Sequence, residues 1–138
     1  MTTKEKLEKI ISHLEADLNV RLLAEGLQPV TAWGCYRVDD SRGEKQCVGT
    51  VSLWGSNIDE DQRSGSVTIE IRLPSGQDNK MDDYQDCLIA SLDAGGHFGG
   101  AFLETWVSSE EKWPSGPQVH GAVMAELTVR MDRMESEE

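Results

Sequence analysis

The sequence lacks a hydrophobic run long enough to cross a membrane: no stretch of about 18 apolar residues occurs within its 138 residues. The N-terminus, Met-Thr-Thr-Lys-Glu-Lys, also lacks the apolar segment and the small-residue cleavage site of a signal peptide. We therefore expect a soluble protein that is made in the cytoplasm and has no membrane partner.

Basic residues are few, with 13 Lys and Arg against 25 Asp and Glu, which gives a net charge of −12. Because nucleic-acid affinity depends mostly on neutralising phosphates, this balance disfavours direct binding to DNA or RNA. Solvated loops and a frayed end explain most of the acidic clusters without a partner. These clusters are Asp39-Asp40, Asp59-Glu60-Asp61, Asp82-Asp83 and an acidic tail at residues 132–138.

Cysteine and histidine are scarce, with three of each, and neither has the spacing of a metal site or a redox motif. No Gly-x-Ser-x-Gly nucleophile motif occurs either. Asp83 and Asp86 could pair for acid–base work, although acids at a helix start usually serve capping and solubility. We expect no metal, no cofactor and no enzymatic activity.

Cys35 and Cys47 lie symmetrically about a turn-like segment at residues 39–43. Across a hairpin they could face each other and join in an oxidising medium, whereas a reducing cytoplasm should keep them as thiols. The glycine-rich segment at residues 95–100 lacks the Lys and the Ser or Thr of a phosphate-binding loop, so we interpret it as a flexible or tightly turning connection.

Strict alternation of apolar and polar residues predicts two long strands with one buried face each. In the first strand the buried residues are Val67, Ile69, Ile71 and Leu73. In the second they are Val123, Ala125, Leu127, Val129 and Met131, within a strand predicted over residues 119–131. Two such strands imply a sheet with one wet face.

Two amphipathic helices are predicted. Thr2 and Glu5 have the spacing of a capping box, and an apolar stripe follows at Leu7, Ile10, Ile11, Leu14 and Leu18, up to a break by Gly26. A second helix shares Met81, Tyr84, Leu88 and Leu92 on one face. Asp78 or Asn79 is its expected cap, and Gly95-Gly96 its expected end.

The remaining pattern predicts a β-hairpin from strands at residues 31–38 and 46–54, then a long acidic loop at residues 55–65. A short strand at residues 102–107 and a polar loop at residues 108–116 complete the chain. We predict a single α+β domain over residues 1–138, a mostly antiparallel sheet with two amphipathic helices packed on one side.

Four of the eight aromatic residues are tryptophans: Trp33, Trp54, Trp106 and Trp113. Tryptophan is favoured where one edge is buried and the other meets a polar partner, as at protein interfaces. Core packing remains the alternative for each. Trp54 and Trp113, each beside a predicted loop, are our candidate contact residues.

Taken in order, these pieces resemble the bacteriophage tail terminator proteins, the family of the lambda-type minor tail protein U. The resemblance covers nearly the whole chain. It is carried by a short N-terminal helix, the strand at Val51 to Leu53 leading into an acidic loop, the strand ending Ile69-Glu70-Ile71-Arg72-Leu73-Pro74, an acidic approach to a helix, and the final strand Ala125 to Met131.

The resemblance implies a structural virion protein that forms a ring, six-fold in the family, on the head-proximal end of the tail tube. Such a ring ends tube polymerisation and offers a docking face to a head–tail connector or neck protein, while DNA passes through its lumen without specific binding. Under this hypothesis the acidic loop Asp59-Glu60-Asp61 faces the lumen or a neighbouring subunit, and Arg63 and Arg72 are its pairing partners between subunits.

Three other functions fit parts of the pattern. Another virion component of related fold, such as a tail tube or neck protein, is the nearest alternative. An acidic nucleic-acid mimic that inhibits a DNA-binding enzyme is the second, although its carboxylates should be spaced like phosphates over one face. A small enzyme is the third, with the least support from the residues.

Overall fold

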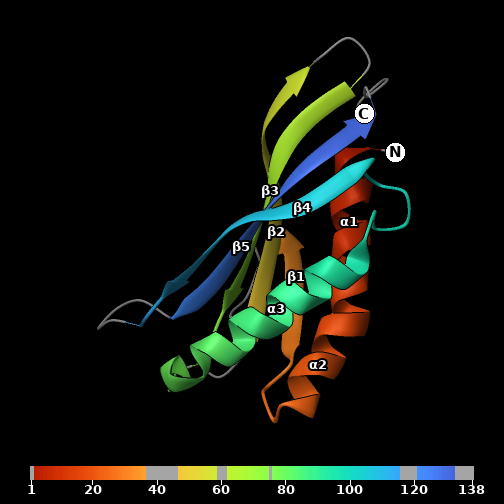
Figure 1. Cartoon of the computed structure of the whole chain (residues 1–138). Coiled ribbons are helices and arrows are strands. Elements are labelled where there is room, and N and C mark those ends of the chain that lie inside the picture. The colour runs from red at the N-terminus through yellow and green to blue at the C-terminus, as the bar shows by residue number, and fades with distance from the viewer. Residues whose placement is uncertain (1, 37–46, 59–61, 75, 116–120, 133–138) are drawn as a thin grey trace.

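The computed structural model describes residues 2–36, 47–58, 62–74, 76–115 and 121–132. Its fold is α+β: one five-stranded sheet with helices on one face, as the alternation and the helical stripes predicted (Figure 1). The sheet order is β1-β2-β3-β5-β4. The strands are β1 (Val30–Cys35), β2 (Cys47–Ile58), β3 (Gln62–Arg72), β4 (Glu104–Trp113) and β5 (Ala122–Asp132).

The first helical stretch consists of α1 (Thr3–His13), a π-helical turn (Leu14–Leu18) and α2 (Asn19–Ala24). Its capping box is present, because the Thr2 side chain accepts from the Glu5 backbone while the Glu5 carboxylate accepts from the Thr2 backbone. This bonding lowers the pKa of Glu5. The stretch ends with Gly26 at φ +74° and a bond from the Leu27 amide to the Leu22 carbonyl.

The second helix, α3 (Met81–Gly95), lies across β4 and β5 on the same side of the sheet as α1 (Figure 1). It ends as predicted, with Gly96 at φ +59°. The prediction of an Asp78 or Asn79 cap is wrong: both residues lie in a 3₁₀ turn (Asp78–Lys80), and no side chain caps the helix. The Asp78 carboxylate accepts instead from the amide and hydroxyl of Ser115.

The buried faces of the sheet and the helices form one core. The alternating residues of β3 and β5 that we expected inside are 0–1% exposed. They pack against the helical stripe, in which Leu7, Ile10, Leu14, Leu18 and Leu22 are fully buried. Tyr84 of α3 is also fully buried, and its hydroxyl bonds both the amide and the carbonyl of Gln28 just before β1.

The predicted hairpin at residues 31–54 is wrong, because β1 and β2 pair in parallel. The connecting residues 37–46, with their turn-like sequence, lie outside the described residues. In the parallel register Cys47 is opposite Val30 and Cys35 is opposite Val51, so the two cysteines sit at opposite ends of the pair. Both are free thiols, and the geometry that a disulfide between them would need is not present.

The two predicted polar loops are largely strand. β2 continues to Ile58 and β3 begins at Gln62, so only residues 59–61 separate them, and these lie outside the described residues. Likewise β4 runs on to Trp113, through the segment we expected as loop. Backbone pairing to β3 and β5 therefore overrides the polar composition of these segments.

The glycine-rich segment after α3 makes a tight turn. Gly96, Gly99 and Gly100 have positive φ, and the turn buries Phe98, whose ring meets His13 edge-on at 5.5 Å between centroids. His13 is half-buried beside the apolar stripe, as expected, with Nε2 2.7 Å from the Ser91 carbonyl oxygen. The segment thus ties α1 to the end of α3.

Candidate functional site

The sheet has two outer strands, β1 and β4, and β1 is closed where it begins. The Asn19 side chain donates from Nδ2 to the Val30 carbonyl at 3.1 Å and accepts the Val30 amide at 2.9 Å. One amide side chain thus takes the place that a further strand would occupy. The edge is also short, with six residues in β1.

The other outer strand, β4, has ten residues and pairs only with β5 among the described strands. The Leu73 amide donates to the Gly121 carbonyl, so the backbone of Gly121 faces β3. Backbone groups alternate in direction along an antiparallel strand, so the even-numbered residues of β5 face β4. The bond from the Leu103 amide to the Arg130 carbonyl agrees with this assignment.

The same alternation fixes which groups of β4 point away from the sheet. Glu104, Trp106, Ser109, Glu111 and Trp113 are opposite the even-numbered residues of β5 and turn their amides and carbonyls to it. The backbone groups of the intervening residues therefore point to the open edge. These residues are Thr105, Val107, Glu110 and Lys112. We call this row of backbone groups the β4 edge.

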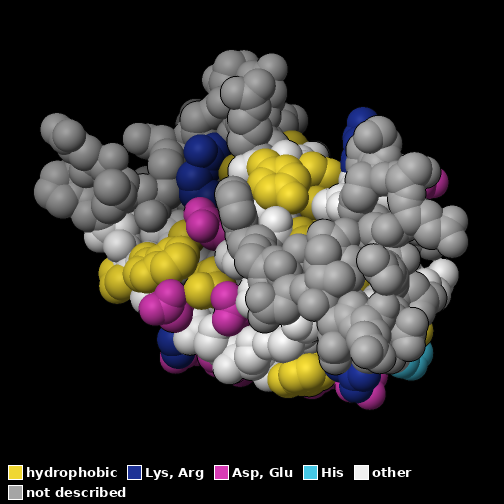
Figure 2. Space-filling model, turned by 90° about the horizontal axis from the view of Figure 1, so that it is seen from above, with side chains coloured by type: hydrophobic (Ala, Val, Ile, Leu, Met, Phe, Trp, Pro, Cys, Tyr) yellow, Lys and Arg dark blue, Asp and Glu magenta, His cyan; other side chains and the backbone are white. Residues whose placement is uncertain are grey.

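Side chains along β4 divide between the helix side and the opposite face of the sheet, which we call the outer face. Trp106 and Trp113 both belong to the outer face, because they are opposite Thr128 and Ala122, whose neighbours in β5 point into the core. They are 47% and 41% exposed. Figure 2 shows exposed apolar side chains with Asp and Glu beside them in the view from above.

Carboxylates accompany these tryptophans on the outer face. Glu104 pairs with Arg130 at 3.2 Å, and Glu126 accepts from the hydroxyls of Ser108 and Ser109 at a bulge in β4. Glu111, two residues before Trp113, is exposed. Apart from Arg130, these side chains give the exposed part of β4 an acidic, aromatic surface.

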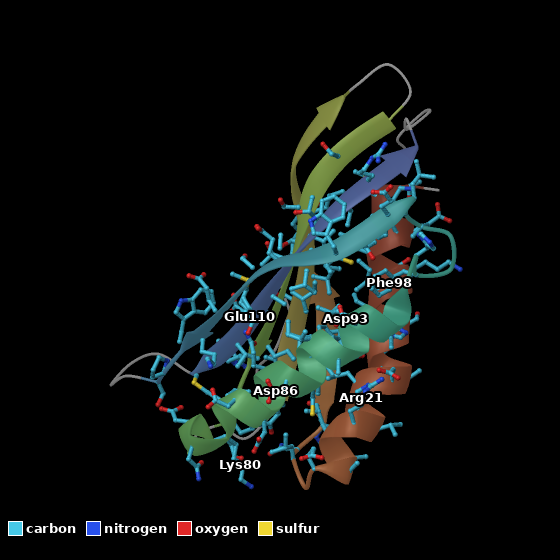
Figure 3. All side chains as sticks on the ribbon, viewed as in Figure 1. Arg21, Lys80, Asp86, Asp93, Phe98 and Glu110 are labelled. Atoms are coloured by element: carbon cyan, nitrogen blue, oxygen red, sulfur yellow. The ribbon has the colours of Figure 1, made fainter. Side chains whose placement is uncertain are left out.

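On the helix side, β4 is fastened to α3. Lys112 pairs with Asp82 at 2.6 Å, and this bond raises the pKa of Lys112. Gln85 is buried and donates to the Met124 carbonyl at 3.2 Å, with Glu110 also within 3.5 Å (Figure 3). Together with the pairing of β4 with β5, these contacts position β4 before any partner binds, so the β4 edge is a preformed surface.

A groove of about 360 Å³ lies between α2 and α3. Its walls include Arg21, Asp86 and Cys87, and Figure 3 shows Arg21 and Asp86 on the two helices. Arg21 is held by Asp17 at 2.7 Å. Burial raises the pKa of the Cys87 thiol, which lowers its thiolate fraction and its reactivity at neutral pH.

The predicted contact residues fall at both ends of the sheet. Trp113, Ala122 and Arg72 occupy one row across β4, β5 and β3, so Trp113 and Arg72 share the outer face at one end. Arg63 is the second residue of β3, at the far end, about 30 Å away at 3.3 Å per residue. Trp54 ends the regular pairing of β2 with β3, and Asp59-Glu60-Asp61 lie outside the described residues.

Trp106 was not among our candidates, although it is the most exposed of the tryptophans whose side chains are described. The sequence signal that could have identified Trp106 is the alternation of Thr105 and Val107 with Glu104 and Trp106. It was missed because the sequence does not show that β4 is an outer strand, with its polar side chains on an accessible face.

Neither known protein families nor curated proteins match this chain. Within the described ranges, no cluster of three His, Cys, Asp or Glu residues is placed to hold a metal ion. No helix in the same ranges is long and apolar enough to span a membrane.

Proposed function

We propose that this chain is a subunit of a phage tail terminator ring, which caps the head-proximal end of the tail tube and presents a face to the neck. The observation that carries the proposal is the succession of elements: one helical stretch, three strands, a second helix and two strands in one open sheet. This succession agrees with the one on which the sequence resemblance rests.

The placement of the candidate contact residues suits head-to-tail association, which closes into a ring when the rotation between copies allows it. Arg72 lies at one end of β3, whereas Asp59-Glu60-Asp61 follow β2 at the other. A pair between Arg72 of one copy and this acidic segment of the next joins two different surfaces. Such heterologous contacts generate rings when the rotation closes. Trp54, Arg63 and Trp113 complete the proposed contacts with a neighbouring subunit or the tube.

The charge of the chain also suits a ring around DNA. At −12 per copy, a lumen lined by these subunits would repel the phosphate backbone, so DNA would slide without binding. The same repulsion discourages unspecific association of subunits.

The test is the mass of the purified chain by light scattering over a concentration series, with negative-stain images alone and with tail tubes. Closed rings that cap tube ends support the proposal. Open filaments would reassign the chain to the tube proteins, and a monomer that ignores tubes would reassign it to the acidic mimics or other binding modules.

Arg72→Glu sharpens this test, with Lys4→Glu, an equal charge reversal at an exposed site on α1, as its control. We expect Arg72→Glu to abolish rings and Lys4→Glu to retain them. Because Arg72 is half-buried, urea unfolding of each variant must show a folded protein. Rings that survive Arg72→Glu would refute the assigned contact.

A further inference from the structure

We propose that the β4 edge binds an extended, basic segment of another protein, which adds to the sheet as a sixth strand next to β4. This inference does not depend on the proposed ring. It rests on the open backbone groups of β4, on its exposed tryptophans and on the carboxylates beside them.

The backbone supplies the affinity in this mode of binding. Thr105, Val107, Glu110 and Lys112 direct their amides and carbonyls away from β5, which is the arrangement that an added strand requires. Their positions are fixed through the bonds of β4 and β5 to α3. Little ordering entropy is therefore lost on the protein side when a strand binds.

The side chains of β4 define the chemistry of the partner. On the outer face, an added strand would place alternate side chains beside Glu111 and Trp113, and further along beside Trp106. A Lys or Arg beside Glu111 forms an ion pair, and one over either indole gains a cation–π contact. The matching partner therefore carries Lys or Arg at every second position.

A second copy of this chain matches the β4 edge poorly. It would bring another net charge of −12 and another strand with Glu104, Glu110 and Glu111. Two features of β4 also discourage indiscriminate pairing of strand edges. These are the bulge between Val107 and Ser109 and the charged side chains on the helix side. The acidic charge that repels a second copy attracts a basic partner.

The experiment titrates the full chain with the peptide acetyl-Thr-Arg-Val-Arg-Val-Arg-Thr-amide. We expect saturable binding with a change in tryptophan fluorescence, and slower hydrogen exchange at the amides of Thr105, Val107, Glu110 and Lys112 by NMR. The same peptide with Glu in place of Arg should not bind. Trp113→Ala and Trp106→Ala should each weaken binding about fivefold.

Two variants of one residue separate strand addition from simple charge attraction. Glu110→Pro and Glu110→Ala both remove one negative charge, but only proline removes the amide that points to the open edge. We expect Glu110→Ala to keep the affinity within about threefold and Glu110→Pro to lower it about tenfold or more. Urea unfolding checks that both variants fold.

Three results would overturn the proposal. The first is equal affinity of the Glu110→Pro and Glu110→Ala variants, which would mean that the peptide is held by charge alone. The second is an arginine peptide that does not saturate. The third is a dimer of the chain alone that Glu110→Pro dissociates, because the occupant of the β4 edge would then be a second copy.

Discussion

The two outer strands of the sheet differ in how their free backbone groups are treated. At β1 the Asn19 side chain bonds both the amide and the carbonyl of Val30. At β4 the backbone amides and carbonyls of four residues point outward, beside two exposed tryptophans. Uncapped strand edges invite pairing with other chains, so proteins commonly cover them. The comparison separates β1, whose first residue is capped by a side chain, from β4, whose outward backbone groups we propose as the binding site of a partner strand.

The largest effect should come from proline at neighbouring positions of β4. Glu111→Pro removes an amide that faces β5, and with it one hydrogen bond of the ladder between β4 and β5, which should cost about 3 kcal/mol. Glu110→Pro removes an amide that faces the open edge and should cost less than about 1 kcal/mol. Urea unfolding measures both. Equal losses would contradict our assignment of the β4 edge.

The next largest difference should be the stability lost when the tryptophans of the two outer strands are replaced. The ring of Trp33 on β1 packs on the core and covers Gly49, where any Cβ would collide with it. Trp33→Ala should therefore lower the free energy of unfolding by about 2 kcal/mol, since the ring is only half-buried. Trp106→Ala and Trp113→Ala should each change it by less than about 1 kcal/mol. A larger loss at Trp113 than at Trp33 would reverse the comparison.

Opening the β1 edge should have a smaller effect. Asn19→Ala removes both bonds to Val30 and should destabilise the fold by about 1 kcal/mol. The more telling readout is mass by light scattering, because an uncovered β1 should increase self-association with concentration. Asn19→Asp, which keeps the acceptor for the Val30 amide, is the matched control. If the alanine variant stays as monodisperse as the parent, Asn19 does not protect the edge.

The smallest effect should be a pH dependence near Asn19. Arg21 binds Asp17 at 2.7 Å, and this hydrogen bond lowers the pKa of that carboxyl below its ordinary value. A lowered pKa contributes stability that is present above the ordinary value and lost as pH falls through the folded value. The difference in unfolding free energy between the parent and Asp17→Asn should thus shrink below about pH 4. A difference that is constant from pH 7 to pH 2 would contradict this.

The sequence predicted the elements that depend on local chemistry. The capping box at Thr2 and Glu5, the end of α3 at Gly95 and the buried residues of β3 and β5 are confirmed. The turn-like residues 39–43 led us to predict a hairpin, which is wrong. Such residues indicate that the chain changes direction, but not which strands pair or in which direction. Likewise, polar composition hid the second half of β4, whose exposed edge position tolerates polar residues.

The candidate site was predicted only in part. Trp113 and Arg72 were found from residue type, yet their common row on the outer face depends on the pairing of β4, β5 and β3. Trp106 and the role of Asn19 were missed. Both depend on which strands lie outermost, and Asn19 contacts Val30 across eleven residues of sequence.

The sequence by itself determined which apolar side chains of β3, β5 and the two helices face the core, since a period of two or 3.6 residues assigns a face to each residue whatever the neighbouring element is. It also determined the charge, the beginning of α1 and the end of α3. Only the tertiary structure decided the direction of β1 and the order of the strands. The same backbone groups pair in either direction and with any neighbour, so the choice depends on how the whole core packs.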